Sequence, residues 1–346
     1  MRRAVPVVAV AALVTSLAAW QPAVRAADGP YRLVKAIPVG GEGGWDYASV
    51  DPAAKRLYVT HATKVVVIDT ESNTVVGEVA DTPGVHGFAV APDLGRGFSS
   101  NGRESKASIV DLKTLKTLSK VDTGPNPDAI LYEPQHKEVY AFNGNGKSAT
   151  VFDAATGAVK ATIPLPGKPE FAVVDVRAGR IYSNIEDTSS VVVIDTARRA
   201  VVATWPIAPG EEASGLAIDL ASHRLFIGCS NNMMVMMDST SGKVLGNVPI
   251  GEGVDANAFD PGTGFAFASS SDGTLTVAKV EAGKLTVVQK LATPQRTRTM
   301  TLDPVTHRLY AAAADYKPGP SGADGKPGRP TLVPGSFRVM VYELAK

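Results

Sequence analysis

The chain has 346 residues, of which 35 are basic and 34 acidic, so its formal net charge is +1. Domains that bind nucleic acid through phosphate contacts usually carry a basic surplus, and this even balance argues against that class, although it leaves a local basic patch open. Cys229 is the only cysteine, which excludes an intramolecular disulfide.

The first 26 residues have the pattern of an export signal. Met1-Arg2-Arg3 is a short basic start, residues 4–19 are apolar, and Val24-Arg25-Ala26 places small residues at a cleavage site. We expect Sec-type export with cleavage after Ala26, and a periplasmic or secreted protein without a membrane span. A retained N-terminal anchor is the alternative. Cleavage would leave 32 basic and 34 acidic residues, a net charge of −2.

An acidic residue ends a short apolar run at nearly constant intervals of 42, 42, 42 and 43 residues, at positions Asp69, Asp111, Asp153, Asp195 and Asp238. A repeat of about 40 to 45 residues built from β-type runs is typical of a propeller blade, whose four-stranded sheet must stack on its neighbours. The same Asp residues, followed by Thr or Ser, are expected to form turns rather than to act as catalytic acids.

The repeat predicts an all-β fold, a seven-bladed β-propeller over residues 27–346. The last blade has strands near residues 299–313 and 337–342 but no outer strand after them. Residues 31–39 match the outer-strand pattern and precede the first blade. We therefore expect this N-terminal strand to complete the last blade and close the ring, covering exposed sheet edges.

Superposing the blades brings one polar position into register at the start of each innermost strand: Asp46, His86, Asp128, Glu170, Ser214, Asp255 and Arg298. We expect these residues to form a ring at one mouth of the central channel. One interpretation is structural, because polar residues at turns satisfy backbone groups. The other is a pocket that holds a cation or a polar small molecule, which the unlike residues at equivalent positions favour.

A metal ion is the most specific ligand that the pocket interpretation suggests. Carboxylates with one imidazole on four consecutive blades could bind a divalent ion such as calcium, magnesium or zinc, through Asp46, His86, Asp128 and Glu170. No two of these ligands share a short local motif, so the identity of any cofactor stays unknown.

Other residues should share the mouth. His61 begins a loop on the same face as His86, beside Trp45 and Tyr47, whereas the remaining histidines, His136, His223 and His307, fall in turns on the opposite face. The predicted ligand-binding set is therefore Asp46, His86, Asp128, Glu170, Asp255, Arg298, His61, Trp45 and Tyr47. No catalytic residue is assigned.

Two segments invite special functions. The run from Cys229 to Met237 is rich in soft copper(I) ligands, but Met234, Met236 and Met237 occupy positions of buried strand residues, so core packing is expected. Residues 316–336 interrupt the last blade with a Pro- and Gly-rich insertion. This insertion should overhang the mouth, either as a lid or as a solvated loop without a role.

The elements Arg56-Leu57-Tyr58-Val59-Thr60-His61 and Val67-Ile68-Asp69-Thr70 resemble the YVTN-type β-propeller repeat of the bacterial YncE-like family, over essentially all of residues 31–346. The resemblance implies an exported seven-bladed ring, usually a binding or scaffold module, with DNA binding proposed for some relatives. No residue can be matched to nucleic-acid contacts. Repeat motifs of this kind specify fold more strongly than activity.

Three classes of function follow. The first is a non-enzymatic binding or scaffold protein, expected to be a monomer, that presents the mouth to a small ligand or a protein partner. The second is a lactonase-type or other metal-assisted hydrolase with a carboxylate or His86 as general base. The third, a redox accessory protein, lacks a haem-attachment motif. No nucleophile elbow or phosphate-binding loop is present. Whether the protein is an enzyme stays open.

Overall fold

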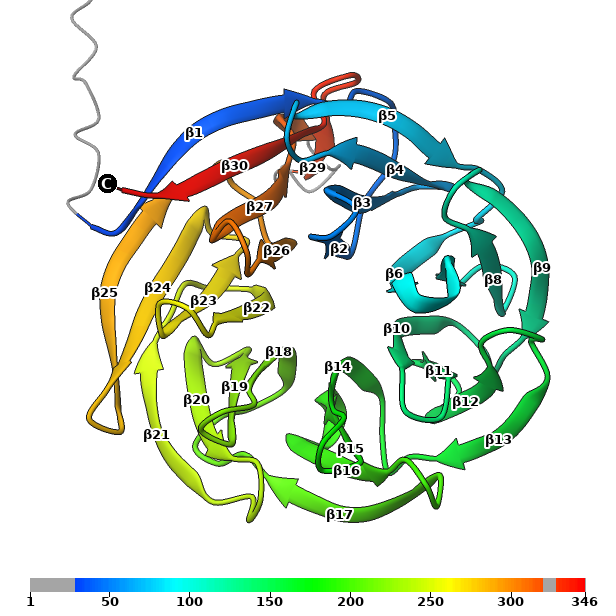
Figure 1. The fold of residues 1–346 in the computed structure, drawn as a ribbon. Helices are drawn as coiled ribbons and strands as arrows, with labels where there is room; N and C mark the ends of the chain where they lie inside the picture. Colours follow the sequence, from blue (N-terminus) through cyan, green and yellow to red (C-terminus); the bar gives the residue numbers. More distant parts are fainter. Residues whose placement is uncertain (1–28, 320–327, 346) are drawn as a thin grey trace, which may run out of the picture.

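The computed structural model describes residues 29–319 and 328–345, and the predicted signal peptide lies outside them. Seven four-stranded antiparallel sheets surround a central hole, which confirms the all-β, seven-bladed propeller (Figure 1). Within this described part, two single-turn 3-10 helices interrupt the strands, η1 (Pro92–Leu94) and η2 (Glu186–Thr188). Among the described residues, no helix is long and apolar enough to cross a membrane.

Each of the first six blades is a run of four consecutive strands from the innermost to the outermost. Blade 1 holds β2 (Ala48–Asp51), β3 (Arg56–His61), β4 (Lys64–Asp69) and β5 (Thr74–Val79). Blade 2 holds β6 (Val85–Ala91), β7 (Arg96–Asn101), β8 (Lys106–Asp111) and β9 (Lys116–Asp122). Blade 3 holds β10 (Pro127–Glu133), β11 (Glu138–Asn143), β12 (Ser148–Asp153) and β13 (Val159–Pro164).

The same order continues around the ring. Blade 4 holds β14 (Pro169–Asp175), β15 (Arg180–Ile185), β16 (Ser190–Asp195) and β17 (Ala200–Pro206). Blade 5 holds β18 (Ala213–Asp219), β19 (Arg224–Cys229), β20 (Met233–Asp238) and β21 (Val244–Pro249). Blade 6 holds β22 (Val254–Asp260), β23 (Phe265–Ser270), β24 (Thr274–Glu281) and β25 (Lys284–Ala292).

Blade 7 joins the two ends of the described chain, as predicted. Its sheet runs β26 (Met300–Asp303), β27 (Arg308–Ala313), β30 (Arg338–Leu344) and β1 (Tyr31–Pro38). β1 lies antiparallel to β30, with Ile37 opposite Val339. Tyr31 and Ile37 are each 1% exposed. Because β1 supplies hydrogen bonds and buried side chains to a sheet from the other end of the chain, it clasps the ring.

The periodic Asp residues form turns, as the sequence predicts. Asp69 Oδ1 accepts hydrogen bonds from the backbone N–H groups of Glu71 and Ser72, 3.1 and 2.8 Å long. These bonds hold the tight connection from β4 to β5, and they lower the pKa of Asp69. Equivalent bonds are made by Asp111, Asp153, Asp195 and Asp238.

The core lies between neighbouring blades rather than inside one blade. Met234, Met236 and Met237 on β20 are fully buried, in agreement with core packing instead of a copper site. Cys229 is buried as well. Polar ties cross the same interfaces, since the Tyr182 hydroxyl of blade 4 donates a 2.8 Å hydrogen bond to the Ser239 carbonyl of blade 5.

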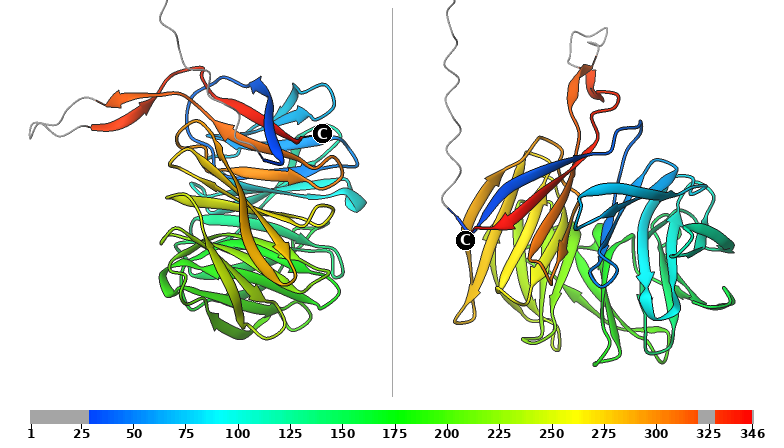
Figure 2. Two further views of the ribbon diagram at one scale, coloured as in Figure 1. Left: turned by 90° about the vertical axis from the view of Figure 1, so that its left-hand side faces the viewer. Right: turned by 45° about the horizontal axis from the view of Figure 1, so that its top comes forward.

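The insertion of blade 7 contains a two-stranded hairpin in its described part, β28 (Tyr316–Gly319) and β29 (Gly328–Leu332). It projects away from the disc instead of folding over the channel (Figure 2). At its base, Arg338 forms a 2.8 Å ion pair with Asp315. The expected overhang is therefore limited to the base of the hairpin, where the Tyr316 ring lies 5.0 Å from the guanidinium carbon of Arg296.

Candidate functional site

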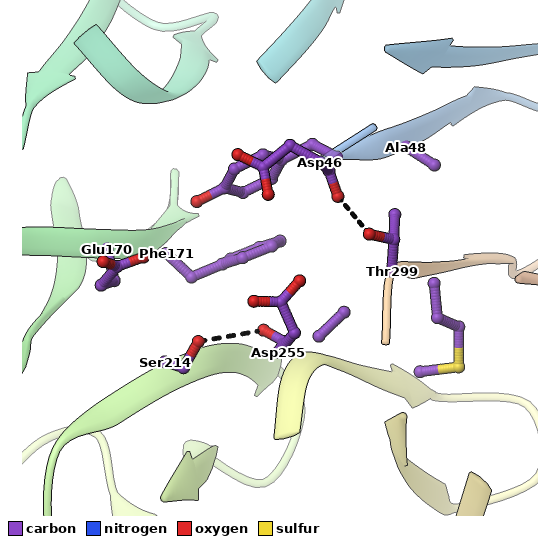
Figure 3. Close-up of a pocket in the computed structure, with 10 residues that line it drawn as sticks. Asp46, Ala48, Glu170, Phe171, Ser214, Asp255 and Thr299 are labelled. Atoms are coloured by element: carbon purple, nitrogen blue, oxygen red, sulfur yellow. Dashed lines mark hydrogen bonds between the residues drawn. The ribbon is translucent and has the colours of Figure 1, made fainter. Parts of the chain in front are cut away.

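The polar ring predicted from the repeat lies at the start of the innermost strands, β2, β6, β10, β14, β18, β22 and β26, which surround the hole (Figure 1). We call this face the mouth. Backbone and side-chain bonds join neighbouring blades here. The Thr299 hydroxyl donates to the Asp46 carbonyl at 2.5 Å, and the Ser214 hydroxyl donates to the Asp255 carbonyl at 3.4 Å (Figure 3). Residues at the ring position therefore help to hold neighbouring blades together.

His86 and two carboxylates make the tightest group in the mouth. His86 Nδ1 lies 2.6 Å from Asp46 Oδ2 and 3.8 Å from Asp128 Oδ1. Burial disfavours the imidazolium, but the hydrogen bond to Asp46 and the negative charge of Asp128 outweigh it and raise the pKa of His86 to about 9. Burial, together with the charge of Asp46, also raises the pKa of Asp128.

Glu170 lies in an ion-pair chain beside this group. Lys168 Nζ contacts Glu170 Oε1 and Glu186 Oε2, each at 2.5 Å. Burial and the charge of Asp128 raise the pKa of Glu170 to about 8. Because Lys168 divides its charge between two carboxylates, it offsets only part of the cost of ionising the buried one.

Asp255 and Arg298 form the third charged pair, with 3.4 Å between Oδ1 and Nη1. Burial raises the pKa of Asp255 to about 7, and Arg298 opposes that rise. The Arg298 side chain is 49% exposed, so its guanidinium is accessible from the mouth. The ring thus combines a largely buried acidic floor with an accessible cation.

Aromatic rings lie among these carboxylates. Tyr47 of blade 1 and Phe171 of blade 4 pack with ring centroids 5.2 Å apart. Phe171 extends from its strand between Asp46 and Asp255 (Figure 3). The space that remains is a cavity of about 20 Å³, lined in part by Tyr47, Phe171, Glu170 and Asp255. This volume suits roughly one water molecule.

Two larger cavities open at the mouth. The His86 cavity has a volume of about 450 Å³ and is lined by Trp45, Asp46, His86, Arg103, Asn126 and Arg298, with several small residues. The Tyr316 cavity has a volume of about 470 Å³ and is lined by Trp45, Val254, Ser271, Arg296, Arg298 and Tyr316, with two glycines. Gly44, Trp45 and Arg298 belong to both walls.

Trp45 and His61, both predicted at the mouth, differ in their exposure to the cavities. Trp45 lines both cavities and stacks on Phe337, with ring centroids 4.7 Å apart. His61, expected at the surface of the mouth, is 1% exposed and stacks on the same Phe337 at 4.4 Å. The preceding loop covers it, because a Cβ on Gly41 would lie 2.9 Å from His61 Nε2. Burial accordingly lowers the pKa of His61.

The blade repeat does not single out several residues that lie at the mouth. Asn126, Lys168 and Arg296 each stand two residues before a ring residue, and Phe171 stands one after. The blade alignment contains these positions in the same register as the ring. The alignment of the blades could therefore have identified these residues, but only the ring position is polar in every blade.

Comparisons with known proteins agree with the architecture. No family model matches the chain, and a search of curated proteins gave no match. A solved chain described as Kuenenia stuttgartiensis hydrazine synthase has a TM-score of 0.70 and 16% sequence identity, over 84% of this chain and 95% of that one. This chain is a seven-bladed β-propeller. At that identity the likeness shows the propeller fold alone, and the YncE-like resemblance stays a prediction.

Proposed function

We propose that the propeller is a non-enzymatic binding protein whose mouth holds a small molecule with an anionic group. The observation that carries the proposal is the pair of cavities, about 450 and 470 Å³, that share Trp45 and Arg298. Ligand sites in proteins are typically concave, with volumes of about 300 to 1,000 Å³ and a few convergent polar groups.

The chemistry of the walls favours an anion next to an apolar or aromatic body. Arg103 and Arg298 face the His86 cavity, and Arg296 and Arg298 face the Tyr316 cavity. A guanidinium can hold a carboxylate through two parallel hydrogen bonds, and aromatic rings such as Trp45 provide flat contact area. Asp255 holds Arg298 from below at 3.4 Å, which positions the guanidinium before the ligand arrives.

A hydrolase of the lactonase type is the second candidate, and the raised carboxylate pKa values favour it. Burial and neighbouring charges raise the pKa of Asp128 to about 6 and that of Asp255 to about 7. A carboxylate that titrates near neutrality suits a general base, and such shifts cluster at active sites. Buried ion-pair networks give the same shifts without catalysis, so the binding role comes first.

The cellular setting belongs to the same proposal. The basic and apolar start of the chain supports Sec-type export to the periplasm or the medium, and the repeat motif supports kinship with exported YncE-like propellers. A protein partner at the mouth is the alternative occupant. The projecting hairpin would widen that contact surface.

The test is a thermal-shift and calorimetric screen of small aliphatic and aromatic carboxylates against the mature protein. At least one is expected to bind, and Arg298→Ala should weaken it about tenfold or more, as loss of a charge-assisted pair requires. Arg177→Ala, an exposed arginine in the turn at the opposite face, is the matched control. A screen without any binder, or equal affinity in Arg298→Ala, overturns the proposal. Turnover of a lactone or ester panel would favour the hydrolase.

A further inference from the structure

We propose that Asp46, His86 and Asp128 form a binding site for one divalent transition-metal ion of the zinc class, with an open coordination position toward the His86 cavity. The site goes beyond the small-molecule binding proposed above and does not depend on it. An imidazole nitrogen and two carboxylate oxygens are suitable ligands for Zn²⁺. Three protein ligands with one free position is the usual arrangement where a metal also binds a second molecule.

The ligand atoms are nearly in place. One donor atom from each of the three residues lies within 4.8 Å of the other two. Ligands at about 2.0 Å from a tetrahedral zinc ion are separated by roughly 3.3 Å. The 2.6 Å distance from His86 Nδ1 to Asp46 Oδ2 would lengthen slightly, and the 3.8 Å distance to Asp128 Oδ1 would shorten by a similar amount. The ligand atoms of Asp46 and Asp128, no more than 4.8 Å apart, would also approach each other.

A second observation points to a cation. Asp128 is 8% exposed, and its carboxylate has a hydrogen bond to the Tyr47 side chain. Its Oδ1, however, is inaccessible to solvent and accepts no hydrogen bond from any described residue. Buried carboxylate oxygens are almost always hydrogen-bonded or metal-bound, because desolvation without a partner is costly. This oxygen is the one that faces the imidazole of His86. A metal ion between the two would supply the missing partner.

The imidazole is also held from its other side. The Asn126 side chain hydrogen-bonds to His86. Its Oδ1 and His86 Nε2 lie 2.7 and 2.6 Å from the point where a Cβ on Gly102 would stand, so the glycine leaves room for both groups. A histidine that ligates a metal through one ring nitrogen usually donates its other N–H to an oxygen. Asn126 occupies that supporting position.

The charges of the site match a divalent ion. Two carboxylates and a neutral imidazole carry a net charge of −2, which one M²⁺ ion neutralises. The nearby cation Arg298 is paired with Asp255, and Lys168 is paired with Glu170 and Glu186. An anionic molecule in the His86 cavity could reach both the open metal position and the guanidinium of Arg298, because both face that cavity.

The test is titration of chelator-treated mature protein with ZnCl₂ by isothermal calorimetry, without any organic ligand, followed by metal analysis after gel filtration. One zinc ion per chain is expected. Asp128→Asn, which keeps the shape of the side chain, should weaken binding at least tenfold, because replacing even an outer-shell partner of a metal ligand typically costs about tenfold to hundredfold. His307→Ala is the matched control, because His307 forms a 2.7 Å pair with Asp260 outside the mouth.

The outcomes separate the two proposals. Zinc binding that Asp128→Asn weakens and His307→Ala leaves unchanged supports the metal site, whatever the carboxylate screen finds. Absence of zinc binding by a folded wild-type protein overturns it, as does equal affinity in wild type and Asp128→Asn. Thermal unfolding of each variant identifies loss of folding, and Asp46→Asn provides an independent ligand substitution if Asp128→Asn does not fold.

Discussion

Tyr47 of blade 1 packs against Phe171 of blade 4 across the interior of the ring, with their centroids 5.2 Å apart and their planes inclined by 31°. Residues far apart in the chain thereby meet in the interior of the ring. Glu170 and Asp255 line the same small cavity as the pair, and burial raises the pKa values of both carboxyls.

Truncating one ring of this pair should destabilise the propeller moderately. Phe171→Ala removes an aromatic contact and leaves a void, and because Phe171 is only partly buried we expect a loss of about 2 kcal/mol in the free energy of unfolding. Urea unfolding followed by circular dichroism measures it. Phe171→Leu, which keeps most of the volume, should lose less than half as much. Equal stability of wild type and Phe171→Ala would show that the contact contributes nothing.

The sequence predicts which residues lie at the mouth better than it predicts the contacts that their side chains make. The interval between Asp69 and Asp111 and its repetitions fixes the blade period, because each Asp makes the same turn. The order of polar residues at the mouth follows from that register. The contact between Tyr47 and Phe171 does not, because blade alignment gives the height of a residue on its strand but not how far its side chain reaches inward.

Two further features of the site depend on partners that a repeat cannot specify. Lys168 precedes the ring residue Glu170, but its second ion pair forms because η2 brings Glu186 alongside. His61 has the register of a mouth residue, yet it is buried because the glycine-rich loop before β2 covers it. Loop conformation decides both cases, and the 42-residue period carries no information about it.

Glu170 should make stability depend on pH. Its folded pKa, raised by burial and by Asp128 to about 8, exceeds the unfolded value of 4.5. The folded state therefore binds more protons, and the stability from this group is complete below about pH 4.5 and is lost as pH rises through 8. Glu170→Gln cannot ionise, so its stability relative to wild type should increase by about 1 to 3 kcal/mol between pH 5 and pH 8.5.

Thermal unfolding of metal-free protein across that pH range measures the difference. Glu78→Gln is the control, because Glu78 forms a 2.7 Å ion pair with Lys64 at a side chain that is 51% exposed. Its profile should run parallel to that of wild type. A parallel profile for Glu170→Gln as well would mean that Glu170 is ionised throughout the range.

The clasp strand β1 should be required for the stability of the whole ring. Deleting residues 27–40 removes the partner of β30 and the buried side chains of Tyr31 and Ile37. Each buried side chain contributes about 2 kcal/mol, so we expect the free energy of unfolding to fall by about 4 kcal/mol or more. A chain that begins at residue 29 is the control. If both chains unfold at the same urea concentration, the clasp has no stabilising role.

Gly102 should be required for the position of His86. A Cβ at this residue would lie 2.6 Å from His86 Nε2 and 2.7 Å from Asn126 Oδ1, closer than such contacts allow. The imidazole cannot move aside without loss of its 2.6 Å contact with Asp46. Gly102→Ala should therefore cost about 1 to 3 kcal/mol in the free energy of unfolding, measured by urea denaturation. It should also shift the imidazole resonances of His86 in a proton–nitrogen correlation spectrum.

The control is Gly246→Ala, because no atom lies within 4 Å of its added Cβ. This variant should leave the free energy of unfolding unchanged or raise it by about 0.5 kcal/mol. If the two alanine variants behave alike, the imidazole is not held in the cradle that the structure shows.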